Sequence, residues 1–233
     1  MRMEGPMRTL DDILRESASQ LHSRLCPRQV LGARMGLVAG CELGLELPRS
    51  DKRLLAIVET DGCIVDAIVA ATGCRVGRRT LRIEDYGKVA ATFVDVDSMR
   101  CLRIVPRAEA RTAALGYAPQ AKSPWEAQLI GYQRMPDVEL LTWCRVLLAT
   151  PLEAILGRPG VRVRCEGCGE EVINQREVVR DGTVLCPACA GDAYYRLGES
   201  SRPWGRSHEP NASMRIPPVT PKDHPRGYLC SLP

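Results

Sequence analysis

The stretch from Arg53 to Cys74, RLLAIVETDGCIVDAIVAATGC, decides the fold of the main part of this chain. Arg53–Thr60 is an apolar run of strand length, which predicts a buried strand. Cys63–Thr72 is an apolar segment that ends at Gly73, which predicts a buried helix. A strand followed at once by a helix indicates a domain in which both kinds of element share one core.

Two helices are expected before this stretch. Thr9 and Asp12 form a capping box, and the helix that they start must end near Cys26 because Pro27 disfavours helical angles at the residue before it. Pro27 can itself open the next helix, which should reach about Leu45. Four glycines at intervals of four residues lie along one side of that helix and indicate close approach of another helix, from this chain or from a second copy: Gly32, Gly36, Gly40 and Gly44. We therefore expect a homodimer.

Three strands and a helical region are expected after it. The strands are Leu81–Tyr86, Val89–Val96 and Arg100–Val105, with Gly87 and the residues around Asp97 as turns. From residue 106 to 156 the apolar pattern becomes helical. Residues 1–158 are thus predicted to form an α+β domain with its strands grouped together.

Composition narrows the class of protein. Of the 233 residues, 45% are hydrophobic and 26% are charged, the balance of a globular protein, and the net charge is only +4. No apolar run is long enough to span a membrane, and the first residues lack the apolar segment of a secretion signal, so we expect a cytoplasmic protein. Eleven cysteines in such a chain favour metal binding or thiol chemistry over disulfides.

The strongest motif is a pair of CxxC sequences, Cys165–Cys168 and Cys186–Cys189, separated by 17 residues. This spacing suits one tetrahedral Zn²⁺ with four thiolate ligands, so we expect one zinc ion per chain. A module of about 38 residues, 161–198, is too small to be held by apolar burial alone, so zinc should hold it folded. Four unrelated buried thiols, or two redox CxxC pairs, are the alternatives.

This finger carries five arginines and six acidic residues, and a zinc–tetrathiolate centre would add about −2 more charge. Phosphate binding needs a clustered positive surface, so the charge favours contact with a protein and disfavours nucleic acid without excluding it. Residues 199–233 hold seven prolines and little apolar periodicity, which predicts a disordered tail.

A weaker pattern lies near the start of the chain. His22 stands four residues before Cys26, so both can face the same side at the end of the first helix. They are the candidates for a reactive thiol with its base, or for a second metal site in the core. Cys63 and Asp66 share one helix face and are candidates for the same second site. Ordinary packing of these residues is the alternative.

These residues carry a resemblance to a known family. His22–Pro27 followed by Val30–Gly36 resembles the first motif of the FmdE family, named after formylmethanofuran dehydrogenase, which reads roughly HGHxCPG and then LGxRM. Cys63–Ile68, Thr72–Cys74 and Asp85–Lys88 are similar to the family segments CxxDAIQ, TGCTxGKGN and DYGK. The motifs occur in order over about residues 20–95, and a four-cysteine finger follows the core in many members.

The resemblance implies a core of helices packed on a mainly antiparallel sheet, often as an intertwined dimer. It implies a metal site with His22 and Cys26, and it implies association with a molybdenum or tungsten formylmethanofuran dehydrogenase, as an accessory or regulatory protein. The remaining matches to the family motifs are Cys63, Asp66, Cys74, Asp85, Tyr86 and Lys88.

Several positions depart from the family pattern. Arg24 replaces the second histidine, Arg28 replaces a glycine and Val69 replaces a glutamine, while residues 75–80 keep little of the family's glycine-rich segment. Two guanidinium groups in place of an imidazole should weaken cation binding and could recruit an anion. Two further hypotheses therefore remain: a nucleic-acid-binding regulator with a sensing core, and an enzyme with Cys26 as nucleophile and His22 as base.

Overall fold

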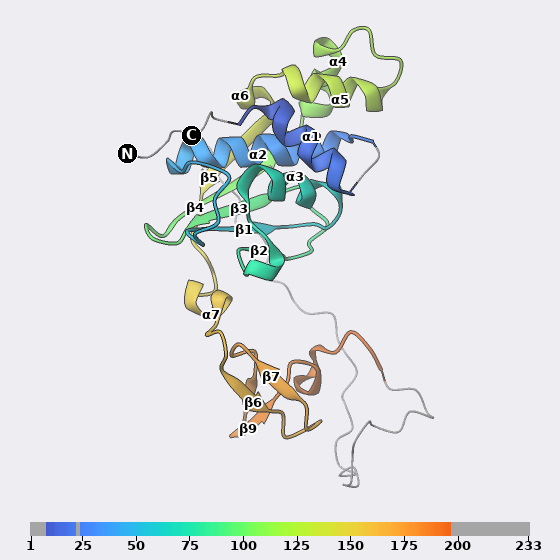
Figure 1. Cartoon of the computed structure of the whole chain (residues 1–233). Helices are drawn as coiled ribbons and strands as arrows, with labels where there is room; N and C mark the ends of the chain where they lie inside the picture. Colours follow the sequence, from blue (N-terminus) through green and yellow to red (C-terminus); the bar gives the residue numbers. More distant parts are fainter. Residues whose placement is uncertain (1–7, 22–23, 197–233) are drawn as a thin grey trace. The chain divides into compact units, whose positions relative to one another are not determined.

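The computed structural model describes residues 8–21 and 24–196 of the chain (Figure 1). The chain divides into two compact units, residues 1–151 and 152–233, and each is described by itself. The predicted tail, 199–233, and His22 both lie outside the described residues.

The first unit has a five-stranded sheet with the strand order β2-β1-β3-β4-β5. The β1–β2 pair is parallel and the other three pairs are antiparallel, which confirms the predicted α+β class with a mainly antiparallel sheet. Its elements are α1 (Leu10–Leu21), α2 (Pro27–Leu43), β1 (Leu54–Val58), α3 (Cys63–Thr72), η1 (Val76–Arg78), β2 (Leu81–Ile83), β3 (Ala91–Asp95), β4 (Arg100–Pro106), α4 (Ala110–Tyr117), α5 (Pro124–Arg134), α6 (Asp137–Leu140) and β5 (Leu141–Arg145).

One segment differs from the sequence-based expectation. The apolar pattern predicts helices from residue 106 to 156, but Leu141–Arg145 forms strand β5. This strand pairs with β4, with Ile104 opposite Trp143. A partner strand nearly 40 residues earlier in the chain supplies these hydrogen bonds, so local periodicity could not predict them.

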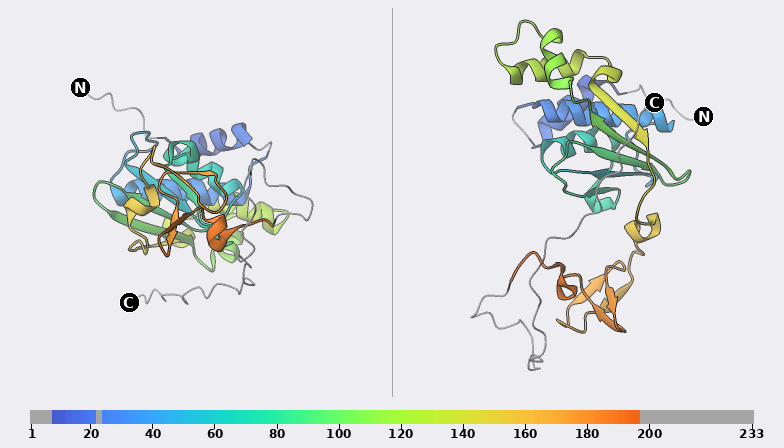
Figure 2. Two further views of the ribbon diagram at one scale, coloured as in Figure 1. Left: turned by 90° about the horizontal axis from the view of Figure 1, so that it is seen from below. Right: turned by 180° about the vertical axis from the view of Figure 1, so that it is seen from behind.

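Helices α2 and α3 lie across one face of the sheet, which can be seen in the views of both Figure 1 and Figure 2. Alternate strand residues point into this layer, as the two-residue period of a strand requires, and Phe93 at the centre is fully buried. The other strand residues of this core are aliphatic: Leu54, Ala56, Val58, Leu81, Ala91, Leu102, Ile104 and Leu141.

The glycines of α2 pack against other segments of the same chain. A Cβ at Gly32 would lie 2.5 Å from the carbonyl oxygen of Ile64, and one at Gly36 would overlap the Cβ of Ala71. Both neighbours belong to α3, so the absence of a side chain lets the two helix backbones approach closely. Gly40 packs against the segment around Leu45 in the same way. The spacing therefore reflects packing within one chain, and the homodimer stays a prediction.

Arg34, in α2, binds the end of α5 and the start of α6. Its buried guanidinium donates to the carbonyl oxygens of Tyr132 and Met135, at 2.9 and 2.8 Å. It also donates to Asp137 Oδ1 at 2.8 and 2.6 Å. These bonds satisfy carbonyl groups at the end of α5, which have no partner inside the helix. Arg34 therefore stabilises the packing of these helices and is not a solvent-exposed charge.

The second unit contains two short hairpins. Asn174 and Gln175 adopt positive φ angles of 60° and 55° and separate the first hairpin from the second. The first hairpin pairs β6 with β7 and the second pairs β8 with β9. The elements are α7 (Leu152–Leu156), β6 (Arg162–Arg164), β7 (Glu171–Ile173), β8 (Val178–Arg180), β9 (Thr183–Leu185) and η2 (Ala188–Asp192).

Helix α7 belongs to this second unit. The guanidinium of Arg176 donates to the carbonyl oxygens of Ala154 and Ile155, at 2.8 and 2.6 Å. The amide N–H of Arg158 donates to Gln175 Oε1 at 2.9 Å. Exposed carbonyls at the end of a helix favour a cation there, so Arg176 stabilises α7 against the hairpins.

No helix within residues 8–21 and 24–196 combines the length and the apolar character needed to cross a membrane. The cytoplasmic location stays a prediction.

The close approach of α2 and α3 gives the first testable prediction. Replacing Gly36 by Ala forces α3 to shift, and we expect unfolding free energy to fall by about 1–3 kcal/mol. A Cβ at Gly116, in helix α4, meets open space, so Gly116→Ala should leave stability unchanged or raise it by up to about 1 kcal/mol. Urea denaturation followed by circular dichroism compares the two variants, and equal midpoints would contradict the packing.

Candidate metal centre and thiol pair

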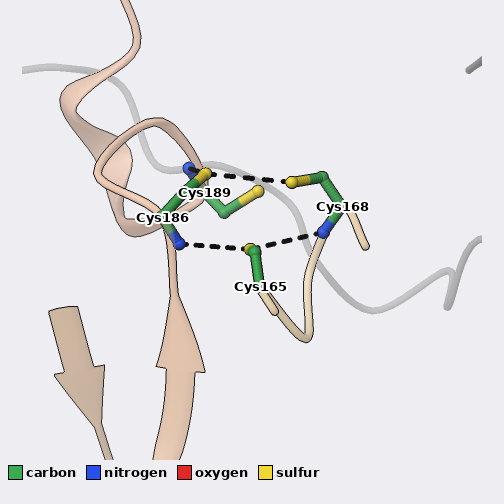
Figure 3. A group of neighbouring side chains, drawn as sticks. All are labelled: Cys165, Cys168, Cys186 and Cys189. Carbon is green, nitrogen blue, oxygen red and sulfur yellow. Dashed lines mark hydrogen bonds between the residues drawn. The ribbon is translucent and has the colours of Figure 1, made fainter. Parts of the chain in front are cut away.

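The second unit brings four sulfurs together. The Sγ atoms of Cys165, Cys168, Cys186 and Cys189 all lie within 4.8 Å of one another, and Figure 3 shows the side chains converging on one point. The first pair comes from the turn between β6 and β7, and the second pair follows strand β9. All four cysteines that the spacing predicts as ligands are therefore placed together.

Backbone amides orient these sulfurs. Cys165 Sγ accepts N–H bonds from Cys186 at 3.1 Å and from Cys168 at 3.5 Å, and Cys186 Sγ accepts one from Cys189 at 3.3 Å. Gly169 has a φ of +76°, which a residue with a side chain rarely adopts. A Cβ at Gly167 would lie 3.1 Å from Cys189 Sγ, so the first turn needs both glycines.

The electrostatics of this cluster favour a cation. Burial disfavours ionisation of Cys165, but the N–H groups that donate to its sulfur outweigh burial and lower its pKa to about 6. Burial raises the pKa of Cys168 to about 11, and the neighbouring Cys165 and Cys186 thiols act in the same direction. Four thiolates so close together repel one another, and a divalent ion removes that repulsion. Four sulfurs that can coordinate one ion tetrahedrally suit Zn²⁺.

The first unit brings two further cysteines together. Cys26 is the residue immediately before α2, and Cys63 is the first residue of α3. Both are partly exposed. Burial raises the pKa of Cys63 to about 11, with the Cys26 thiol as the next cause and Arg28 acting in the opposite direction. Asp66 lies one helical turn further along α3, and His22 lies outside the described residues.

The other segments that resemble the family motifs lie near opposite ends of helix α3. The amides of Tyr86 and Lys88 both donate to the carbonyl oxygen of Glu59 at 3.0 Å, which places Asp85–Lys88 at the end of β1 that leads into Cys63. Cys74 lies at the opposite end of α3, is buried, and donates from its Sγ to the carbonyl oxygen of Leu54 at 3.5 Å. Cys74 is thus a core residue and does not join the Cys26–Cys63 pair.

Gln29 is a positioning residue that the sequence-based predictions omit. Its Oε1 accepts the backbone N–H of Cys26 at 2.8 Å, and its Nε2 donates to Ser17 Oγ of α1 at 2.9 Å. It is fully buried, so the bonds fix the start of α2 against α1. The signal is present in the sequence, because a glutamine three residues after a cap residue is the second half of a capping box.

The family described as "FmdE, Molybdenum formylmethanofuran dehydrogenase operon" matches residues 21–142, which is more than half of the chain. The chain belongs to the FmdE family. A second match, to the prokaryotic dksA/traR C4-type zinc finger, covers residues 157–195 of this FmdE-family chain. The two matches together confirm the predicted FmdE core with a C-terminal four-cysteine finger.

Two individual proteins resemble this FmdE-family chain. A "probable S-adenosyl-L-methionine-binding protein" of Archaeoglobus fulgidus is 29% identical over 205 residues, which is 78% of this chain and 53% of that protein. The chain thus spans about half the length of this curated relative. The crystal structure of a tungsten formylmethanofuran dehydrogenase FmdE-like protein from Syntrophus aciditrophicus is 22% identical. The match covers 84% of this chain and all of that one, with a TM-score of 0.53, and shows the fold.

The second testable prediction concerns Gln29. Gln29→Ala leaves the buried Ser17 hydroxyl and the Cys26 amide without their partner, so unfolding free energy should fall by about 1–3 kcal/mol. Gln133 makes one exposed bond, to the carbonyl oxygen of Leu129, and Gln133→Ala should cost less than about 0.5 kcal/mol. Thermal unfolding of both variants checks this. A Gln29→Ala variant as stable as Gln133→Ala would refute the assigned role.

Proposed function

We propose that this FmdE-family protein is a metal-binding accessory or regulatory protein that holds one Zn²⁺ per chain in its finger. The observation that carries the proposal is the cluster of four sulfurs within 4.8 Å, in the segment that matches a C4-type zinc finger. The second unit has a small buried cluster of Cys165, Val172, Leu185 and Ala190. So little apolar burial supports the view that zinc coordination supplies the folding free energy of the finger.

The finger's partner is proposed to be a protein. Three of its five arginines are already engaged: Arg162 pairs with Glu171, Arg164 donates to the carbonyl oxygen of Gly169, and Arg176 binds the end of α7. Phosphate groups would have to compete with these bonds on a surface with a net negative charge. The family description, which names a molybdenum formylmethanofuran dehydrogenase operon, supports a formylmethanofuran dehydrogenase with molybdenum or tungsten as that partner.

The core is proposed to hold a second, weaker site at the start of α2 and α3. Its ligands would be Cys26 and Cys63 with His22 and Asp66. The raised pKa of Cys63, which burial causes first and the neighbouring Cys26 thiol second, supports this placement. Arg28 lowers the pKa of Cys63 and so lies near the pair, where its charge opposes a cation. The homodimer is proposed on the family resemblance, and sedimentation of a monomer at micromolar concentration would remove it.

The third testable prediction concerns the metal. Purified protein should contain one zinc per chain, and Cys165→Ser should lower this to near zero because it removes the most buried ligand. Cys41 is exposed on α2, in the unit that does not contain the finger, so Cys41→Ser should keep the full zinc content. Mass spectrometry under native conditions measures both. Acid should release the metal, since protons compete for the four thiolates.

A finger that keeps its hydrogen-exchange protection after a chelator has removed the zinc would contradict the structural role of the metal. Zinc that remains in Cys165→Ser would show that the ion is held elsewhere.

The fourth testable prediction separates a protein partner from nucleic acid. In a gel-shift assay at low salt, the zinc-loaded protein should leave a mixed-sequence DNA duplex unshifted at micromolar concentration. Binding that weakens steeply between about 50 and 200 mM salt would instead indicate phosphate contacts and would favour the nucleic-acid alternative. The zinc-free protein is the matched control for unspecific aggregation.

A further inference from the structure

The four sulfurs of the finger differ in how well the chain protects them. Cys165 is buried, with 1% of its surface exposed, Cys168 and Cys186 are partly exposed, and Cys189 is exposed. Cys189 lies in the short helical segment η2, and its sulfur is within 4.8 Å of the other three (Figure 3). A small reagent in solution can therefore reach the cluster first at Cys189.

Hydrogen bonds add to this difference. Cys165 Sγ accepts the backbone N–H groups of Cys186 and Cys168, at 3.1 and 3.5 Å, and Cys186 Sγ accepts that of Cys189 at 3.3 Å. Among the residues that the structure describes, no backbone N–H donates to Cys189 Sγ. A sulfur that accepts N–H bonds is stabilised as a thiolate and is a weaker nucleophile. Cys189 thus combines exposure with a sulfur that no amide stabilises.

Cys186 is well placed to react with a modified Cys189. Pro187 has helical backbone angles, φ −53° and ψ −38°, so the two cysteines of this CxxC sequence are about one helical turn apart. The N–H bond from Cys189 to Cys186 Sγ holds the Cys186 side chain at the start of η2. The two sulfurs lie within 4.8 Å of each other. Side-chain rotation can bring them to the S–S distance of about 2.05 Å that a disulfide requires.

We propose, on the basis of the proposed zinc finger, that Cys189 is its reactive ligand and forms a reversible disulfide with Cys186 that opens the zinc site. The oxidant is a low-molecular-weight disulfide such as oxidised glutathione. The Cys189 thiolate attacks it, forms a mixed disulfide and releases one glutathione thiolate. The Cys186 thiolate then attacks the Cys189 sulfur and releases the second. Two protein thiolates lose two electrons in total, and the two glutathione thiolates take up protons from water.

The disulfide leaves only Cys165 and Cys168 as thiolates in the cluster. A divalent ion held by four sulfurs then loses half of its ligands, and the small apolar cluster of this unit cannot hold the hairpins by itself. Oxidation should therefore release the ion and unfold the finger, and reduction in the presence of zinc should restore both. Contact between the finger and a protein partner then depends on the thiol–disulfide balance of the surroundings.

The first experiment determines which ligand reacts first in the full, zinc-loaded chain. The protein is alkylated briefly with a limiting amount of iodoacetamide, and digestion with mass spectrometry then identifies the modified cysteines. Within the finger, Cys189 should react first and Cys165 last, because exposure and N–H bonds differ most between these two. Modification of Cys165, Cys168 or Cys186 before Cys189 overturns the proposal.

The second experiment adds oxidised glutathione to the same protein without oxygen, while a zinc-sensitive dye follows release of the metal. Mass spectrometry should find a peptide with a Cys186–Cys189 disulfide, about 2 Da lighter than its reduced form, in proportion to the zinc released. Reductant with added zinc should reverse both changes. Zinc that is fully retained when the exposed Cys41 already carries glutathione overturns the proposal, and so does a disulfide from Cys189 to Cys168.

Variants that keep four ligands separate reactivity from coordination. Cys189→His leaves three thiolates and one imidazole, a set that also binds zinc, but removes the attacking sulfur, so oxidised glutathione should release zinc about tenfold more slowly. Cys168→His has the same ligand set and keeps Cys189, so its release should stay within about twofold of the unaltered chain. Equal rates in the two variants would refute Cys189 as the reactive ligand. If either variant fails to bind zinc, the order of alkylation in the unaltered chain decides.

Zinc content measured before oxidation distinguishes the reactive ligand from the proposed function. One zinc per chain that oxidised glutathione fails to release overturns the reactive ligand alone. Reduced protein that contains no zinc overturns the zinc finger itself.

Discussion

The close contact between α2 and α3 is the constraint on which the first unit depends. Gly32 and Gly36 leave no side chain between the helices, so the carbonyl oxygen of Ile64 and the Cβ of Ala71 fill the space. The contact fixes the direction of both helices and lays them together on one face of the sheet (Figure 1).

Different interactions stabilise the folds of the two units. The first unit buries a continuous, mainly aliphatic core between helices and sheet, in which the aromatic rings of Phe93 and Tyr132 are also buried. The second unit buries few apolar side chains, and its two hairpins meet at four sulfurs. Repulsion among those sulfurs must be compensated, so the unit that lacks a large core is also the unit whose chemistry favours a cation.

Four arginines bind groups within their own unit. Arg34 holds the end of α5, Arg103 makes two bonds of 2.6 and 2.7 Å to the buried Glu59, and Arg176 holds the end of α7. Arg53 pairs in the same way with the fully buried Asp95 and holds the pKa of that carboxyl well below its usual range. A phosphate group would have to compete for these four guanidinium groups with the partners that they already have.

The sequence by itself determined the local features. Proline fixes the start of α2, glycine ends α3, and the spacing of the four finger cysteines follows from the reach of a short turn around one point. Only the tertiary structure decided that Leu141–Arg145 is a strand, that Arg34 binds Asp137, and that Arg103 binds Glu59. Periodicity and capping depend on neighbours within a few residues. These three contacts join residues far apart in the chain, and they exist because the packing of whole helices and strands places them together.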